Sequence, residues 1–305
     1  MDRFRLRPAA LALTLALALV ACGDEDTGAP DLFDAERAYR DVEAQVEIGP
    51  RPAGSSGSRE EVRLIQRELR AAGVEDVDVQ RPHANVVGTI PGAQPGAVVV
   101  GAHHDTKDAI SPDFVGANDG ASGVAVVLEL ARVLAPRVEG RSIHLALFDT
   151  EEARGSRPFE VDGTRGSRQY VEYAREDARV GGRQGSPPLD EIEAMVLFDL
   201  VGDCDLQIPL EANSDPDLYG LFAEAAEEAS GSPAPFTGAT GPVGDDHVPF
   251  IEAGVPAVDL IDFSFGEGPP PGSYWHTPED TLDKVCQESL DAVGEAAVRA
   301  LPQIP

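Results

Sequence analysis

Basic residues are scarce in this 305-residue chain, and their scarcity excludes one class of partner. Twenty-four lysines and arginines stand against 54 aspartates and glutamates, which gives a net charge of -30. A chain of that sign repels the phosphate backbone of DNA or RNA, so we expect no nucleic-acid partner. The 42% hydrophobic content is nevertheless enough for a core, and the length fits one large domain or two small ones.

Cysteine is also scarce, and this limits how a metal could be bound. The chain has three cysteines, and no two of them have the spacing of a zinc-binding pair. Any metal must therefore be held by carboxylates and imidazoles. In an oxidising compartment Cys204 and Cys286 could form one disulfide, but two separate thiols fit the sequence equally well.

The sequence lacks a glycine-rich phosphate loop, a dinucleotide-binding fingerprint and an internal repeat. Its apolar run at 11–20 is too short for an ordinary membrane span, but three arginines precede it, as in an export signal. Residues 19–22, Leu-Val-Ala-Cys, resemble a bacterial lipobox, which implies cleavage before Cys22 and lipid attachment to its thiol. The alternative is a plain secretory signal with an incidental cysteine.

We therefore predict three parts in the chain. Residues 1–21 form a lipoprotein signal peptide, 22–32 form a tether too acidic to pack, and 33–305 form one folded domain. This predicts an exported bacterial lipoprotein, anchored through Cys22 on the periplasmic or cell-surface face of the envelope.

Apolar periodicity within the domain predicts alternating helices and strands. Helices are expected at 32–48, 60–72, 123–134, 169–175, 216–229 and 280–300, and strands at 77–80, 85–90, 97–102, 143–148, 194–200 and 257–261. Strands that are apolar throughout favour an α/β fold in which helices cover both faces of a mixed, mostly parallel sheet. In such folds the site lies beyond the carboxyl ends of the strands.

Polar residues follow several of these strands. His103, Glu151, Asp199 and Asp262 each stand at or just past the end of an apolar run. The strongest signal is 148–152, Phe-Asp-Thr-Glu-Glu. Because successive side chains on an extended backbone point in opposite directions, one glutamate can bind a metal while its neighbour acts as a base. Paired glutamates are also common on ordinary surfaces.

Asp119 and Trp275 each allow two interpretations. Asp119 lies among small residues just before a helix, so it either caps that helix or approaches an ion closely. Trp275 is the only tryptophan and directly precedes His276. It either anchors a loop or forms an apolar wall for a small substrate.

Taken in order, these segments resemble the motifs of the zinc aminopeptidase and glutaminyl cyclase superfamily over 33–304. The matching segments are 102–105, 116–119, 148–152, 166–168, 199–202, 245–247 and 275–277. The resemblance implies three zinc ligands: Asp119, Glu152 and His276. It makes Glu151 the general acid/base. Aminopeptidase members hold a second zinc with the equivalents of His103 and Asp199, whereas cyclases use one.

Finer features resemble the cyclase branch. They are the acidic pair Asp245-Asp246 before His247, Trp275 directly before His276, Lys107 after the His-x-Asp motif, and the long stretch 152–166. The chain departs from animal cyclases in two ways: the stretch 152–166 has no tryptophan, and Asp259 replaces a histidine. The resemblance implies catalytic roles for Asp199 and Asp245, and substrate-binding roles for Trp275, Asp246 and His247.

The resulting hypothesis is a one-zinc enzyme that acts on peptide or protein amino termini. It converts amino-terminal glutamine to pyroglutamate and releases ammonia, with Glu151 moving the proton from the α-amine to the ammonia. One alternative is a dizinc aminopeptidase that hydrolyses the first peptide bond. Another is an inactive lipoprotein that only binds peptides, although such a protein has no need for Glu151.

Replacing Cys22 by serine tests the predicted anchor. The Cys22→Ser protein should move from the membrane fraction to the soluble fraction with its activity intact, because the only thiol available for acylation is gone. Membrane partition is measured by fractionation and immunoblotting, and an unchanged distribution would contradict the lipobox interpretation.

Overall fold

The structure is a computed structural model that describes residues 30–137, 140–177 and 185–305. The expected signal peptide, Cys22 and most of the expected tether lie outside the described residues. Among the helices that the structure describes, none is both long enough and apolar enough to cross a membrane.

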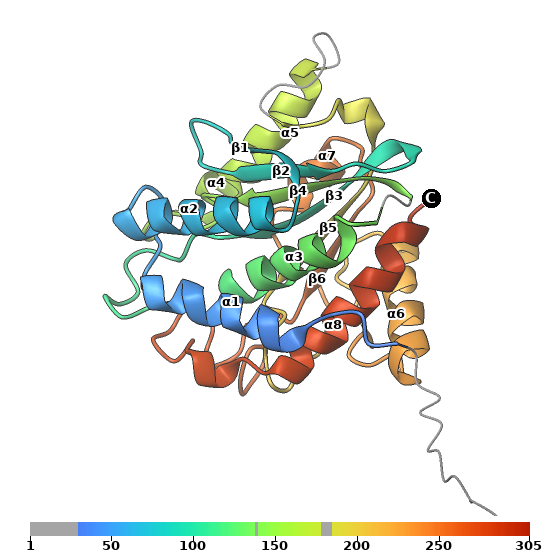
Figure 1. The fold of residues 1–305 in the computed structure, drawn as a ribbon. Helices are drawn as coiled ribbons and strands as arrows, with labels where there is room; N and C mark the ends of the chain where they lie inside the picture. Colours follow the sequence, from blue (N-terminus) through green and yellow to red (C-terminus); the bar gives the residue numbers. More distant parts are fainter. Residues whose placement is uncertain (1–29, 138–139, 178–184) are drawn as a thin grey trace, which may run out of the picture.

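A mixed sheet of six strands runs through the described part of the chain, in the order β1-β2-β4-β3-β5-β6 (Figure 1). The strands are β1 (Glu75–Val79), β2 (Val86–Ile90), β3 (Gln94–His103), β4 (Arg141–Phe148), β5 (Ile192–Asp199) and β6 (Ala257–Ile261). Strands β4, β3, β5 and β6 are parallel neighbours, while β2 pairs antiparallel with both β4 and β1. This confirms the predicted mixed, mostly parallel α/β sheet.

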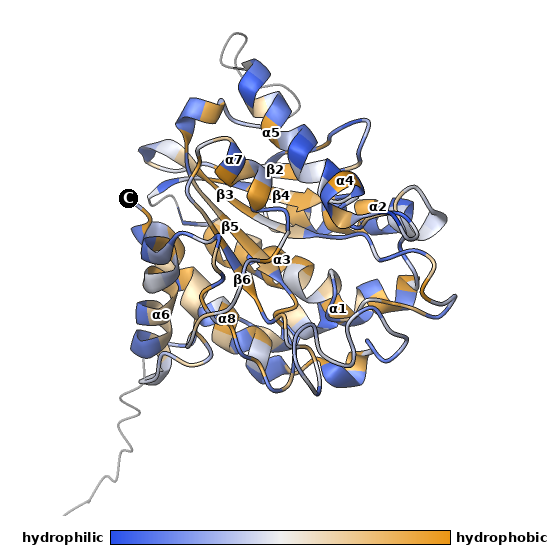
Figure 2. Cartoon of the chain, turned by 180° about the vertical axis from the view of Figure 1, so that it is seen from behind, coloured by the Kyte–Doolittle hydropathy of each residue, from blue (hydrophilic) through white to orange (hydrophobic). Residues whose placement is uncertain are grey.

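Helices cover both faces of the sheet, as expected (Figures 1 and 2). One face carries α1 (Ala35–Ile48), α2 (Ser56–Ala71), α3 (Ala121–Leu134), α6 (Pro216–Ser230) and α8 (Gln287–Ala300), and the other carries α5 (Arg165–Asp177) and α7 (Val248–Glu252). Neighbouring residues of β3 divide between the two cores, because successive side chains of a strand point to opposite faces. Val98 and Val100 pack with the first layer, and Val99 packs with the second.

Two details of the helices differ from the sequence expectation. The last helix begins at Gln287 instead of residue 280, because Asp280 and Cys286 are engaged elsewhere and only the short 3₁₀ turn Leu282–Lys284 lies between them. The two short helices α4 (Phe159–Asp162) and α7 were not expected from the sequence. They have four and five residues, which is too short for a helical period to show.

Cys204 and Cys286 form a disulfide, which settles the alternative that the sequence left open. Their Cα atoms lie 4.9 Å apart. The amide of Cys286 also donates to the carbonyl of Gly202 at 2.9 Å. The cross-link thus joins the segment after β5 to the segment that carries His276.

A completely buried arginine ties the turn after α1 to the loop before α3. The guanidinium of Arg51 donates to the carbonyls of Val115 at 2.7 Å, Gly116 at 3.1 Å and Gln45 at 3.2 Å. Glu61, equally buried, lies 3.9 Å from the arginine Nε. Burial lowers the pKa of Arg51 and raises the pKa of Glu61 to about 7.

We expect Arg51→Ala to lower the free energy of unfolding by about 3–5 kcal/mol, because it leaves buried carbonyls and a buried carboxyl group without their partner. Arg40→Ala is the matched control, since Arg40 forms an exposed ion pair with Glu36 and should cost less than about 0.5 kcal/mol. Urea unfolding of the purified variants measures both changes. Equal midpoints for the two variants would contradict the anchoring role of Arg51.

Candidate active site

The candidate active site lies where β3, β4 and β5 end. His103 is the last residue of β3 and pairs in register with Phe148, the last residue of β4, while Asp199 is the last residue of β5. Thr150 and Leu200 follow these strand ends with positive φ angles of 62° and 50°. Such left-handed residues are uncommon outside glycine, and they turn the chain sharply just beyond the sheet.

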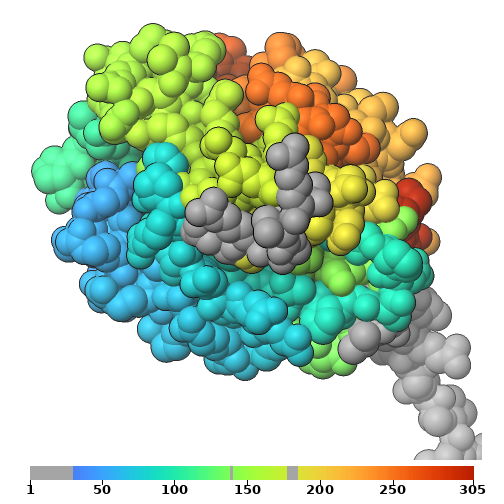
Figure 3. All heavy atoms as spheres, turned by 90° about the horizontal axis from the view of Figure 1, so that it is seen from above, coloured from blue at the N-terminus to red at the C-terminus, as the bar shows by residue number. Residues whose placement is uncertain are grey.

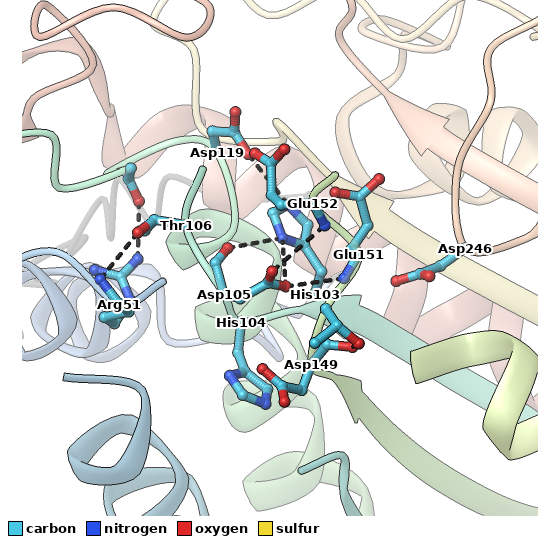
Figure 4. A network of polar contacts seen from close by, with 12 residues as sticks. Arg51, His103, His104, Asp105, Thr106, Asp119, Asp149, Glu151, Glu152 and Asp246 are labelled. Carbon is cyan, nitrogen blue, oxygen red and sulfur yellow. Dashed lines mark hydrogen bonds and ion pairs between the residues drawn. The ribbon is translucent and has the colours of Figure 1, made fainter. Parts of the chain in front are cut away.

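The paired glutamates after β4 are held by their backbone. The buried carboxylate of Asp105 accepts the amide N–H of Glu151 at 3.1 Å and of Glu152 at 3.4 Å. Figure 4 shows Asp105 beneath both residues, with His104 and Asp149 pointing away from them. Asp105 therefore fixes where both glutamate side chains begin.

Asp119 does not cap the helix that follows it. The cap of α3 is Gly120, which makes no side-chain hydrogen bond and has a φ of 92°. A Cβ at that glycine would lie 3.1 Å from Cε1 of His103, so the loop can pass closely beneath the imidazole. The Asp119 side chain is left free to face the imidazoles of His103 and His276.

The structure brings the three expected zinc ligands together. Nε2 of His276 lies 2.9 Å from a carboxylate oxygen of Glu152 and 3.4 Å from Oδ2 of Asp119. Among the described residues, this buried Oδ2 has no hydrogen-bond partner. One imidazole nitrogen and two carboxylate oxygens form a donor set that zinc accepts, so these residues fit the ion.

A second group of ligand atoms shares Asp119. Nε2 of His103 lies 3.2 Å from Oδ1 of Asp119 and 3.2 Å from Oδ1 of Asp199, and all three residues are buried. Nδ1 of His103 lies 3.0 Å from the carbonyl of Asp105, which orients the ring. Burial opposes the charged imidazole, but Asp199 and its neighbours raise the pKa of His103 well above its usual value. The geometry therefore accommodates either one or two ions.

Further carboxylates crowd the same space. Burial and the neighbouring Glu152 raise the pKa of Glu151 well above the ordinary glutamate value. Burial, Asp199 and Asp246 do the same to the pKa of Asp245. Like charges this close cannot all ionise without a cation or a shared proton to offset their repulsion.

A cavity of about 410 Å³ opens over these groups. Its acidic floor is formed by Asp119, Glu151, Glu152, Asp199 and Asp245, and its wall includes Phe159, Phe263 and Trp275. The Trp275 ring stacks on the His276 imidazole with centroids 3.7 Å apart and planes at 16°. Phe263 meets the indole edge-on at 5.5 Å. Trp275 thus lines the cavity and also packs against His276, one of the expected zinc ligands.

Asp246 and His247 are buried and do not line the cavity. Asp246 accepts the hydroxyl of Ser167 at 2.5 Å. His247 lies between Glu211 at 3.3 Å and Asp259 at 3.6 Å. Both residues are therefore buried outside the lining of this cavity, and their expected substrate-binding roles stay predictions.

Two further aspartates hold backbone amides and do not line the cavity. Asp262 follows β6 but accepts the amides of Gln207 and Ser264 and does not face the cavity. Sequence reasoning missed Asp280, whose buried carboxylate accepts the amides of Asn118 at 2.8 Å and Asp119 at 3.1 Å. No local pattern marked Asp280, because its partners lie about 160 residues earlier.

Several proteins are similar to this chain. A solved glutaminyl cyclase from an Acidobacteriales bacterium has a TM-score of 0.77 at 30% identity, and the match covers 93% of this chain and 99% of that chain. A Zn-dependent exopeptidase from Parabacteroides distasonis has a TM-score of 0.71 at 25% identity, covering 88% of this chain and 97% of that one. A glutaminyl-peptide cyclotransferase from Bos taurus is 28% identical over 285 residues, covering 81% of this chain and 75% of that protein.

A family model covers most of the same region. The model of Peptidase family M28 matches residues 85–301, a range that includes both groups of ligand atoms and the whole lining of the cavity. This match spans more than half of the chain, and the chain belongs to Peptidase family M28.

Proposed function

We propose that the protein is a zinc-dependent glutaminyl-peptide cyclotransferase. In this reaction the α-amine of an amino-terminal glutamine forms a bond to the side-chain amide carbon, and the amide nitrogen leaves as ammonia. The similar proteins from Bos taurus and an Acidobacteriales bacterium carry this name or the name glutaminyl cyclase, and the second matches almost end to end.

The observation that carries the proposal is the position of Asp245. It lines the cavity with the acid/base candidate Glu151, and its buried Oδ2 has no hydrogen-bond partner among the described residues. An unsatisfied buried acceptor is costly unless something donates to it. The side-chain amide of glutamine offers two N–H donors for such an acceptor.

The main task of the protein is to orient the α-amine toward the side-chain amide, because both reacting groups belong to one substrate residue. Asp119, Glu152 and His276 would hold a zinc ion, and that ion would supply Lewis-acid polarisation of the amide carbonyl. Glu151 takes the proton from the attacking α-amine and delivers it to the departing nitrogen. Asp199 and Asp245 hold the amide N–H groups, while the Trp275 face excludes water from the side chain.

A second candidate function rests on the group around His103. Because His103, Asp119 and Asp199 also converge, the site has the donors for two ions that share Asp119. That arrangement supports an aminopeptidase, in which Glu151 takes a proton from an attacking water. The similarity to a Zn-dependent exopeptidase fits this alternative.

Location at the cell envelope is part of the proposal and rests on sequence alone. Cys22 lies about a dozen residues before α1 in the sequence, so a short tether would separate the catalytic domain from the lipid. An anchored enzyme of this kind would act on peptides or proteins that reach the periplasm or cell surface.

Glu151→Gln should reduce ammonia release from Gln-peptides by about 100- to 10,000-fold, because a neutral amide cannot accept the amine proton. The variant should retain its zinc, since Glu151 lies outside the expected ligand set. Glu160→Gln, which changes an exposed glutamate of α4, is the matched control and should leave activity unchanged. If the activity of Glu151→Gln were within a few-fold of the wild-type activity, the acid/base role of Glu151 would be wrong.

Metal content separates the two candidate functions. If the protein is a cyclase, the wild type should hold about one zinc per chain by elemental analysis, His103→Ala should retain it, and His276→Ala should lose it. If it is an aminopeptidase, the wild type should hold about two, and His103→Ala should lose one together with hydrolysis of a leucine anilide. Two zincs without ammonia release from Gln-peptides would exclude the cyclase.

A further inference from the structure

One stretch of this acidic protein carries an excess of positive charge. From the residue after Glu152 to the first turn of α5, residues 153–168 contain four arginines and two acidic residues, whereas the whole chain has a net charge of -30. These arginines are Arg154, Arg157, Arg165 and Arg168. In Figure 3 the green-yellow residues after β4 gather at one edge of the molecule, beside the teal loop after β3. The amide of Gly155 joins the two segments by donating to Asp108 at 2.5 Å.

Arg157 is the arginine of this stretch that lines the cavity. Its NH1 lies 3.1 Å from the carboxylate of Asp162, and its side chain is 60% exposed. The same carboxylate accepts a bidentate contact from Arg154 at 3.0 and 2.6 Å. Arg165 also lies 3.9 Å from this carboxylate. One aspartate thus faces three guanidinium groups, so a net positive charge remains at the cavity mouth.

The cavity therefore has charges of opposite sign at its two ends. Its floor consists of carboxylates on side chains such as Asp119 and Glu151, which are less than one-tenth exposed. Its mouth carries the exposed guanidinium of Arg157. Lys107 also lines the cavity, but its ammonium is engaged by the carbonyl of Ala153 and lies 3.7 Å from Glu152. A chain that enters with its ammonium group first meets the floor with that end and the mouth with its next residues.

We propose that Arg157 is a specificity-determining residue that favours peptides with a carboxylate side chain immediately after the amino-terminal residue. The inference rests on the proposed function only in that the site receives peptide amino termini. A guanidinium whose position is fixed by Asp162 forms hydrogen bonds with carboxylate oxygens readily and repels a lysine side chain.

The expected preference is modest, because the ion pair forms at a solvent-exposed mouth. Exposed pairs of this kind correspond to about two- to five-fold in kcat/KM. The preference should shrink as salt rises from about 0.05 M to about 0.5 M, because the Debye length falls to about 4 Å and screens the attraction between the guanidinium and the carboxylate. A purely structural role for Arg157 would not make substrate preference depend on salt.

The test uses three carboxyl-amidated peptides that begin with glutamine and differ only in the second residue: glutamate, glutamine or lysine. The wild type should favour glutamate over lysine, Arg157→Gln should lose this ratio, and Arg157→Lys should keep part of it. Arg168→Gln is the matched control, because the exposed guanidinium of Arg168 faces Glu252 at 3.6 Å and does not line the cavity. The ratio should be unchanged in Arg168→Gln.

Binding of the same peptides to Glu151→Gln, measured by calorimetry, keeps the inference separate from the cyclase proposal. If binding favours glutamate over lysine only when Arg157 is present, the specificity role of Arg157 is supported. If the wild type at the same time releases no ammonia, the cyclase function is excluded. Ammonia release with the same glutamate-to-lysine ratio in the wild type and Arg157→Gln would overturn the inference alone. Failure of every peptide to bind would overturn both.

Discussion

The fold brings several buried carboxylates together at the ends of three parallel strands. Their mutual repulsion is the constraint on which the rest of the site depends. Asp119 is at the centre, because its two oxygens face two different imidazoles. Glu152 and Asp199 approach the same imidazoles from the ends of β4 and β5, the strands on either side of β3. Such an arrangement is unfavourable in isolation, and a cation among these oxygens offsets the cost. The repulsion among these carboxylates would therefore favour the binding of a cation between them.

Holding these charges in place requires a rigid surrounding frame. Asp105 accepts the backbone amides of both glutamates, and Asp280 accepts the amide of Asp119. The guanidinium of Arg51 donates hydrogen bonds to backbone carbonyls of the loop that leads to Asp119. These groups bind main-chain atoms, so they fix where each ligand side chain starts without competing for the ion. The ligand geometry is therefore set by contacts between segments far apart in the sequence.

The sequence predicted the fold well where apolar periodicity was long and uniform, as in β3, β5 and α3. It failed for α4 and α7, which are shorter than the period that would reveal them, and at the start of α8, where Asp280 and Cys286 are engaged by distant partners. The convergence of Asp119, Glu152 and His276 followed from resemblance to known motifs. Local patterns alone left Asp119 as either a helix cap or an ion ligand. They could not show that Asp246 and His247 are buried outside the cavity lining, because burial depends on packing between distant segments.

The disulfide has a consequence for the unfolded chain. Cys204 and Cys286 are separated by 82 positions, and the loop they close contains Asp245, all of β6, Trp275 and His276. Closing a loop of that length removes conformational entropy from the unfolded ensemble worth about 4.5 kcal/mol at room temperature. The cross-link joins this loop to the segment just after Asp199, so a chain that has lost its tertiary structure still keeps the two halves of the site tethered. Oxidation therefore shortens the conformational search by which Asp199 and His276, which lie far apart in the sequence, come together again during refolding.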